Sequence, residues 1–525
     1  MAPREMDSSN PTDEGTLSES TRLLSNDVTT SSENDAKRDD DSEELPRTVF
    51  ILSFALVVQS YLLVSVFPYS GFMAMHLIPG LNEETAGRYA GLIASSFMAG
   101  RTFTSFQWGK AADKYGRVAV IKASMLLSAL FSILFGLATT FPMALTFRCL
   151  LGLSNGFMGP IKTLVSEYAQ GDKKKETKMM AMILGMWGYG FLINPAISGF
   201  LSDPIQQYPD VEFVEIFRPI FEKYPFILPN LVGCFVCLLG YVLIHSFVEE
   251  TLPEEKREEF RLGKTIMGLL KRLQKSDQEE RRLENDGEEA VTIFSLMKRQ
   301  GTRDHLFVYW IYSFLLITLD ELFPLYCMSK TTGLGITEKT IGKIFTFGGL
   351  IYVCVQYFFT TKIVDACGYY KALRLGTFLS TPLLFFIPIS LITNQGAEDG
   401  TLTLTSFLFL GIIFALERCF SSVVFSTISM LLNRTVPDDQ RASMNGLAML
   451  GGSFAKSLGP LFGGILFSAS AVNVTPPFGS VVVYSTTTFL GLCLAVGAYF
   501  LREYDGHEQD STKATKDKEE EPPTV

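Results

Sequence analysis

Twelve apolar runs dominate the sequence from about residue 49 onward, each close to the roughly 20 residues with which an α-helix crosses a bilayer. In hydrocarbon, backbone N–H and C=O groups must pair within their own segment, so runs of this length are predicted to be helices. The fold class is therefore an all-α membrane protein. The predicted spans are 49–69, 87–107, 118–138, 142–164, 179–201, 225–247, 305–327, 341–361, 372–392, 403–430, 443–468 and 479–501.

A single run of this kind is also compatible with a buried core helix of a soluble protein. Twelve in series, in a chain of 525 residues of which 47% are hydrophobic, are too many for that alternative. No cleavable signal peptide is expected, because the first 48 residues are polar and acidic.

Charged residues lie mostly outside the apolar runs and divide the chain. Residues 1–48 and 502–525 are acidic and rich in polar residues, a composition that cannot bury a core, so we expect disordered cytosolic tails. Residues 248–304 are predicted to be a charged cytosolic linker. The linker joins a first six-helix bundle, 49–247, to a second one, 305–501.

Lysine and arginine are concentrated in alternate connectors, which indicates an orientation. Connectors rich in these residues face the cytosol, so both termini and the linker are predicted to be cytosolic. These connectors carry Lys110, Lys114, Arg117, Lys122, Lys173, Lys174, Lys175, Lys178, Lys362, Lys371, Arg374, Arg434 and Arg441, against Arg218, Lys223, Lys330 and Lys339 on the opposite side.

The two halves share short motifs in the same order. Related bundles of this kind place a substrate site between them, near the bilayer midplane. The matching pairs are VFPY (66–69) and LFPLY (322–326), Asp113/Gly116 and Asp365/Gly368, Arg148-Cys149 and Arg418-Cys419, and NPAISG (194–199) and GPLFGG (459–464).

The stretch WGKAADKYGR, residues 108–117, places several charges in a connector between two apolar runs. Gly109 is expected to let one span end close to a neighbour, and Gly116 to allow the left-handed backbone from which the next span starts. Asp113 and Arg117 lie four residues apart, so they can reach helix ends and each other. The alternative is a loop that is charged only because it faces the cytosol.

Gly109, Asp113, Gly116 and Arg117 together resemble the signature loop of the major facilitator superfamily. In that family the loop is a cytoplasmic latch that holds the two bundles together while the substrate site faces outward. The resemblance implies that Glu167 is the acidic partner of Arg117 in this latch. It also implies a major facilitator fold and a transporter without catalytic residues.

Longer stretches resemble one subgroup, the zinc-induced facilitator-like transporters of plants and fungi. They are AGLIASSFMAGRTFTSFQWGKAADKYGR, RCLLGLSNGFMGPIKTLVSEY, DELFPLY and RASMNGLAMLGGSFAKSLGPLFGG, and the similarity extends over most of residues 49–500.

GMWGYGFLINPAISG (185–199) resembles the glycine–proline pattern of the antiporter branch, although Asn194 stands where that pattern usually has Gly. Small residues let helices approach closely, and proline bends the span. The predicted packing residues are Gly188, Gly190, Pro195 and Gly199 in the first half and Gly459, Pro460 and Gly464 in the second.

Six of the charged residues inside predicted spans stand out, because a charge at that depth is costly and tends to be functional. Neighbouring residues on a helix point about 100° apart, so Asp320 and Glu321 cannot both face one site. We predict that Glu321 carries the proton; the alternatives are Asp320, or a Glu321 that is simply solvated at the membrane edge.

Arg148 resembles the arginine that antiporters of the superfamily use in proton coupling, with a structural tie to backbone carbonyls as the alternative. The remaining candidates for substrate or proton coupling are Lys162, Arg418 and Lys456.

These cations favour a small organic anion, a zwitterion or a metal chelate as the substrate of a proton-coupled antiporter. Zinc is bound by three or four His, Cys or carboxylate ligands, and the four histidines are far apart in the sequence, so no metal site and no cofactor are expected. Efflux of free metal ions or drugs, and a solute-sensing receptor on the same scaffold, stay open as alternatives. We expect a monomer that contacts membrane lipids and has no nucleic-acid partner.

ESTRLL, residues 19–24, has Glu19, Leu23 and Leu24 at the spacing of a signal that sorting adaptors read. It predicts a vacuolar or lysosomal membrane, with the plasma membrane as the alternative.

Asn473, in the sequence NVT, is the predicted N-glycosylation acceptor on the non-cytosolic side.

Overall fold

The computed structural model describes residues 47–170, 172–257, 293–398, 400–436 and 441–502. The sorting residues Glu19, Leu23 and Leu24, nearly all of both predicted tails and most of the predicted linker lie outside these ranges. Helices are the only regular structure of the described residues, which include no β-strand.

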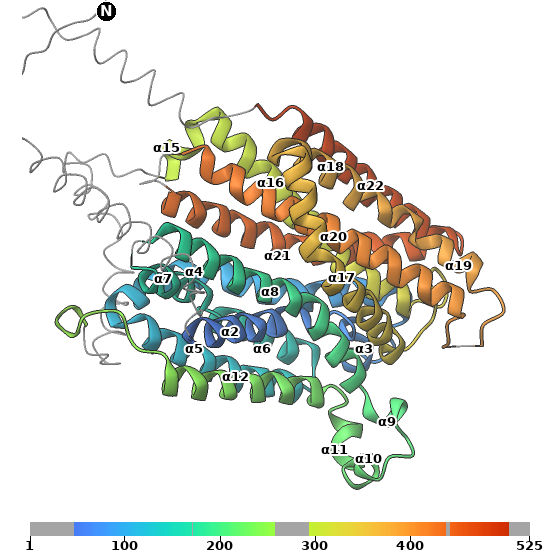
Figure 1. Cartoon of the computed structure of the whole chain (residues 1–525). Coiled ribbons are helices and arrows are strands. Elements are labelled where there is room, and N and C mark those ends of the chain that lie inside the picture. Colours follow the sequence, from blue (N-terminus) through green and yellow to red (C-terminus); the bar gives the residue numbers. More distant parts are fainter. Residues whose placement is uncertain (1–46, 171, 258–292, 399, 437–440, 503–525) are drawn as a thin grey trace, which may run out of the picture. The chain divides into compact units, whose positions relative to one another are not determined.

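The described residues of the first half form eight long or medium helices and three short ones. They are α2 (Arg47–Val64), α3 (Ser70–Leu77), α4 (Glu83–Tyr115), α5 (Arg117–Gly136), α6 (Phe141–Ser154), α7 (Met158–Tyr168), α8 (Lys173–Leu201), the short α9 (Pro204–Gln207), α10 (Glu212–Ile216) and α11 (Arg218–Lys223), and α12 (Ile227–Phe247), followed by the 3₁₀ turn η1 (Glu254–Lys256). Figure 1 shows the long helices of this half gathered together, in blue to green.

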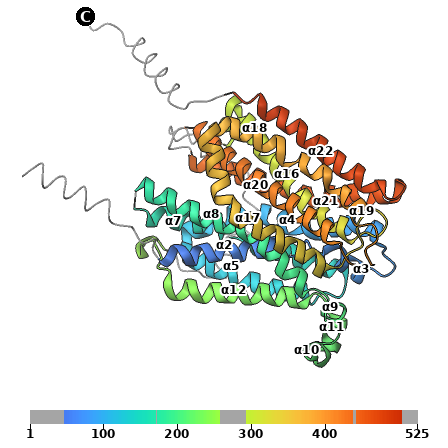
Figure 2. The ribbon, with the colours of Figure 1, turned by 45° about the vertical axis from the view of Figure 1, so that its right-hand side comes forward.

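The second half forms a second group of helices, in yellow-green to red in Figure 2, and α4 of the first half packs against it. Its helices are α15 (Ile293–Lys298), α16 (Gln300–Met328), α17 (Glu338–Cys367), α18 (Tyr369–Ser380), η2 (Pro382–Ile389), α19 (Ser390–Thr393), α20 (Leu404–Arg434), α21 (Arg441–Asn473) and α22 (Phe478–Tyr499).

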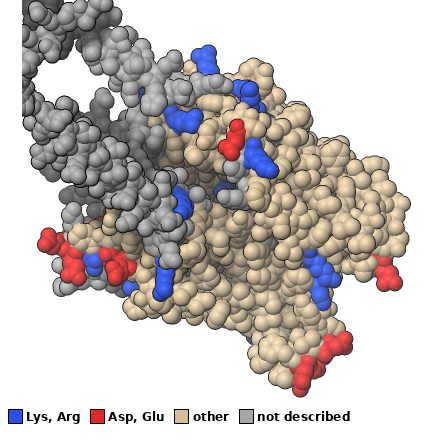
Figure 3. Space-filling model, viewed as in Figure 1, with Lys and Arg blue, Asp and Glu red and all other residues tan. Residues whose placement is uncertain are grey.

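Eight helical segments of the described residues are long and apolar enough to cross a membrane, and the bent helix α17 makes a ninth when its two parts are counted together. The other predicted spans fall on α4, on α6 with α7, and on α8. Charged side chains in Figure 3 lie mainly toward the ends of the helices, and most of the surface between them carries none. The chain is therefore a multi-pass membrane protein, while the count of twelve spans stays a prediction.

The predicted connector at residues 108–117 is mostly helix. Because α4 runs to Tyr115 and α5 begins at Arg117, Gly116 alone makes the turn, with a φ of +103° that favours glycine. Gly368 has a φ of +75° at the matching position between α17 and α18. The expectation for Gly109 was wrong, because a Cβ added there would meet no described atom within 4 Å.

The two halves touch along α4 and α21, where glycines bring the backbones together. A Cβ added at Gly464 would overlap the carbonyl oxygen of Gly87 and lie 2.9 Å from its carbonyl carbon. A Cβ at Gly91 would lie 3.0 Å from the carbonyl carbon of Pro460. Residues without side chains are therefore needed for this contact in the structure.

Hydrogen bonds from helix backbone to serine reinforce the same contact. The backbone N–H of Leu461 donates to Ser95 Oγ at 2.9 Å, one residue after Pro460 in α21. The backbone N–H of Arg88 donates to Ser468 Oγ at 3.0 Å. The contact lies toward the end of the bundle where α4 begins at Glu83. We call this the Glu83 end, and the opposite end, which carries Gly116, the Gly116 end.

Most of the predicted packing glycines do make close contacts. Gly190 faces Ser60 of α2, and an added Cβ at Gly199 would lie 2.8 Å from a backbone oxygen at the start of α17. Gly459 packs in the same way against α16. Gly188 was predicted wrongly, because a Cβ there would meet nothing within 4 Å among the described residues. The prolines Pro195 and Pro460 lie inside α8 and α21.

Candidate functional site

A buried network of charged residues joins α16 to α20. Arg418 pairs with Asp320 of α16, and its Nε lies 3.1 Å from an oxygen of Glu417, its neighbour on α20. Tyr312 donates to Ser421 Oγ at 2.7 Å, and Ser421 in turn donates to Glu417 at 2.5 Å. Two carboxyl groups therefore share one guanidinium, away from water.

Glu321 has a different environment from its neighbour Asp320. Its side chain is 0% exposed, and Ser70 Oγ at the start of α3 donates to its Oε1 at 3.2 Å. Its Oε2 has no hydrogen-bond partner among the described residues. The two acids thus face different helices, as their helical spacing predicts, and the alternative of a solvated Glu321 is wrong. The contact with Ser70 also joins the two halves of the chain.

Arg148 is tied to backbone carbonyls. Its Nη1 and Nη2 donate to the carbonyl oxygens of Leu62 and Leu63, each at 2.8 Å. These carbonyls belong to the last turn of α2, where the helix itself offers no N–H partner. The guanidinium also lies 4.8 Å from the centre of the Phe97 ring and interacts electrostatically with Glu321. The structural tie considered as an alternative is therefore present.

Arg101 is a buried cation that the sequence analysis did not single out. It lies on α4, is 6% exposed, and its Nη2 is 3.2 Å from the sulfur of Met158. With the amide oxygen of Gln59 oriented toward it, that oxygen accepts from both Nη atoms, at 3.2 and 3.0 Å. Arg101 also interacts electrostatically with both Lys162 and Lys456. Arg101 therefore belongs together with two half-buried lysines.

The predicted latch residues meet at the Gly116 end. Arg117 pairs with Glu167 of α7 at 3.0 Å and reaches Asp113 of α4 at 3.6 Å. Glu167 also accepts a hydrogen bond from Thr251, which follows α12. These partners all belong to the first half of the chain.

Glu250 is a further member of this cluster that the sequence analysis missed. Its carboxylate accepts from the backbone N–H groups of Arg117 and Val118, each at 2.9 Å, and so caps the first turn of α5. It lies so close to Gly116 that an added Cβ would overlap it. A carboxylate at a helix N-terminus satisfies free N–H groups and favours the helix dipole. It therefore fixes the backbone from which Arg117 extends.

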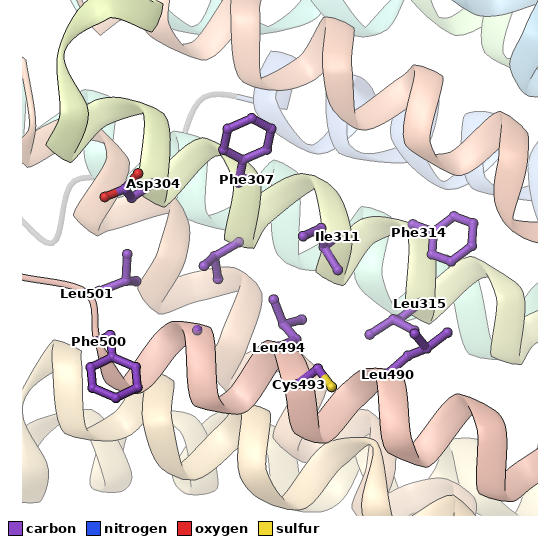
Figure 4. A pocket seen from close by; sticks show the side chains of 12 residues that line it. Asp304, Phe307, Ile311, Phe314, Leu315, Leu490, Cys493, Leu494, Phe500 and Leu501 are labelled. Carbon is purple, nitrogen blue, oxygen red and sulfur yellow. The ribbon is translucent and has the colours of Figure 1, made fainter.

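A groove between α16 and α22 has an apolar lining (Figure 4). Leu494 and Ile311 face each other across it, with Asp304 near one end. Phe307 and Phe500, which also line it, are largely exposed. The groove contains none of the buried cations and acids described above, so we do not assign the solute site to it.

Asn473, the predicted glycosylation site, is the last residue of α21 and is exposed. It lies at the Glu83 end, opposite to Gly116.

Taken together, the fold and the buried charges define a membrane protein of two helical halves with polar groups between them. Comparison with known protein families identifies the family of the chain. The family model of the Major Facilitator Superfamily matches residues 49–417 and 305–523. The chain belongs to this superfamily of secondary transporters, which carry small molecules and are not enzymes.

Curated relatives from Arabidopsis thaliana are similar over most of the chain. Protein ZINC INDUCED FACILITATOR-LIKE 1 is 31% identical over 80% of this chain and 83% of its own length. A probable peptide/nitrate transporter is 30% identical, over 77% of this chain and 80% of its own length. The resemblance to the zinc-induced facilitator-like subgroup is thereby confirmed.

Solved structures show the same fold. A bacterial homologue of the human lysosomal transporter Spinster, in an inward-facing and occupied conformation, matches with a TM-score of 0.61 at 12% identity. The match covers 88% of this chain and 97% of that one. The inward-open xylose transporter XylE from E. coli gives a TM-score of 0.60 at 13% identity, covering 89% of this chain and 99% of that one.

Proposed function

We propose that this protein is a proton-coupled antiporter that moves a small organic anion, zwitterion or metal chelate by alternating access. The observation that carries the proposal is Glu321, a fully buried carboxyl group whose one described hydrogen bond, to Ser70, joins the two halves. An ionisable group at such a depth is usually functional. Because it bridges the halves, its protonation state affects how they are held together.

A proton has a clear place in this arrangement. The unpartnered Oε2 of Glu321 is a position where a proton is held, and Arg148 interacts electrostatically with the ionised form. Loss of the proton leaves a buried charge that one hydroxyl, from Ser70, and a guanidinium already held by two carbonyls support poorly. The ionised state therefore favours separation of the halves near Ser70, which admits water to the carboxylate.

The contacts at the two ends of the bundle support alternating access. At the Glu83 end the halves are joined by the glycine contacts of α4 and α21, and by Glu83, which accepts from the backbone N–H of Lys330 at 2.9 Å. At the Gly116 end, the partners of Arg117 belong to one half. With the Gly116 end and both termini in the cytosol, as the positive-inside rule predicts, this arrangement corresponds to an inward-facing state.

The names of relatives leave the solute open. They include a probable peptide/nitrate transporter and, in Aspergillus fumigatus, a multidrug transporter that is 25% identical. The buried cations favour an anionic group on the substrate. We propose a vacuolar or lysosomal location on the basis of Glu19, Leu23 and Leu24.

Exchange and net transport in proteoliposomes test the proton role. Glu321→Gln should abolish solute movement driven by a pH gradient and preserve solute exchange, because glutamine keeps the shape and a hydrogen bond but does not titrate. Asp320→Asn is the matched control on the same helix. Gradient-driven flux that survives in Glu321→Gln and is lost in Asp320→Asn would assign the proton to Asp320; survival in both variants would place coupling outside α16.

A further inference from the structure

Three cations from both halves of the chain converge on one face of α21. Met449, Gly452 and Lys456 follow one another at helical positions i, i+3 and i+7, so they lie on the same face. Lys162, from α7 of the other half, places its Nζ 3.5 Å from the sulfur of Met449. Lys162 therefore reaches across to the face that carries Lys456.

Arg101 joins this face through Tyr309 of α16. The Tyr309 ring packs so closely on Gly452 that an added Cβ would lie 3.0 Å from its Cε1, and Tyr309 interacts electrostatically with Arg101. Phe425 completes the wall: its ring is 5.9 Å from that of Tyr309 and 5.6 Å from the Nζ of Lys456. We call Arg101, Lys162 and Lys456 the cation triad.

We infer that the cation triad is the substrate subsite and that it binds an organic dianion. This inference rests on the proposed function and narrows its substrate class. Sulfur atoms and aromatic faces are among the described neighbours of the triad, and they interact with cations more weakly than a carboxylate does. Charge-assisted hydrogen bonds to an anion that enters the site are stronger than these contacts.

The charge balance of the buried groups argues for two negative charges. The triad contributes three positive charges, the neighbouring Asp320, Glu417 and Arg418 together contribute one negative charge when all are ionised, and Arg148 with an ionised Glu321 contributes none. Asp320 interacts electrostatically with both Arg418 and Lys456, so the two groups form one electrostatic unit. An excess of two positive charges remains, and like charges close together in a medium of low dielectric repel strongly. A dianion removes this repulsion, whereas a monoanion removes only part of it.

The position of the triad also explains how binding affects the halves. Arg101 and Lys162 belong to the first half and Lys456 to the second, so a dianion that contacts all three draws α7 and α21 toward each other. Gln59, which accepts from the guanidinium of Arg101, positions Arg101 without contributing charge. An Arg101→Lys change would lose this planar, two-point contact.

Thermal unfolding of the purified full-length protein tests the inference. Succinate and sulfate, both divalent, should raise the melting temperature at equal ionic strength, whereas butyrate, chloride and putrescine should not. Arg101→Gln and Lys456→Gln should each weaken succinate binding about tenfold or more, and Lys456→Arg should largely restore it. Arg374→Gln is the matched control, because Arg374 contacts Leu501 and Tyr499 instead.

Each outcome decides between explanations. Equal stabilisation by butyrate and succinate, or unchanged binding in both Gln variants, would overturn the dianion subsite. Flux of a zwitterion or metal chelate that depends on Glu321, without any dianion binding, would leave the proposed antiport intact and refute the subsite. Dianion binding that depends on the triad, without flux driven by a pH gradient, would keep the subsite and refute proton coupling. The Lys456→Arg variant guards against loss of folding as the cause.

Discussion

The contact of Gly464 with Gly87 gives a sharp test of the closed Glu83 end. In Gly464→Ala the new Cβ would overlap the Gly87 carbonyl oxygen, lie 2.9 Å from the carbonyl carbon and lie 3.2 Å from the Cα of Gly91. These obstacles are backbone atoms, so no side-chain rotation relieves the overlap and α4 and α21 must move apart. Overpacking of this kind costs about 1–3 kcal/mol.

That cost applies only while the Glu83 end is closed, so it changes a conformational equilibrium. A difference of about 1–3 kcal/mol changes the ratio of two states by roughly 5- to 150-fold. We expect Gly464→Ala to shift the population toward the form that is open at the Glu83 end. Transport should fall, because the closed form is a required step of the cycle.

Distances between spin labels at the exposed residues Arg88 and Val472 measure this shift, in a protein without its eight native cysteines. A population with longer distances should appear in Gly464→Ala. Gly446→Ala, on the same helix, is the control, because a Cβ there meets nothing within 4 Å among the described residues. Both variants gain the same helix propensity. Identical distance distributions in Gly464→Ala and wild type would refute the role of the glycine contact.

Three further predictions concern the ends of the chain and its connectors. Glu250→Ala should destabilise the first turn of α5 by about 0.5–2 kcal/mol, measured as faster hydrogen exchange of the first backbone amides of that helix. Glu250→Gln should have a smaller effect, and unchanged exchange in Glu250→Ala would contradict the capping role. Burial raises the pKa of Asp203 despite the hydrogen bond from the backbone N–H of Gln206, so ionisation of Asp203 lowers the stability of the folded protein. This cost is absent below the pKa of the unfolded state and fully present above the pKa of the folded state. Asp203→Asn should therefore raise the melting temperature more at neutral than at acidic pH, and equal effects at both would refute this. Replacement of Leu23 and Leu24 by Ala should move the protein to the plasma membrane, and an unchanged distribution in microscopy would remove the vacuolar or lysosomal proposal.

Local features of the site could be predicted because helical spacing determines them. Asp113 and Arg117 were expected to reach each other from their separation of four residues, and they lie 3.6 Å apart. The different directions of Asp320 and Glu321 follow from the angle between neighbouring residues of a helix. Gly116 was expected to have a left-handed backbone, and it does.

The missed residues were missed because their partners are far away in the sequence. Glu250 lies in a long charged stretch, where its carboxylate looks like one of many, and only the fold brings it to Arg117. Arg101 lies a few residues before the charged latch stretch, so it resembles the solvated end of a span. Its burial against Met158 depends on the break between α6 and α7, which falls at Asn155-Gly156, a turn pair inside a run that the sequence analysis treated as one span.

The two repeated arginines show how one motif acquires different chemistry in each half. Arg148 reaches carbonyls that are free because α2 ends at Val64, whereas the matching carbonyls of Thr318 and Leu319 lie inside α16, which continues to Met328. Arg418 therefore needs acidic partners. Alignment of VFPY with LFPLY places Asp320 opposite Val64, so the acid stands where the first half has an apolar residue. A fixed tie to carbonyls does not titrate, whereas a guanidinium held by carboxyl groups changes its attraction when one of them gains a proton. This difference leaves Arg148 to hold the end of α2 in position beside Glu321, where we propose that the proton is carried.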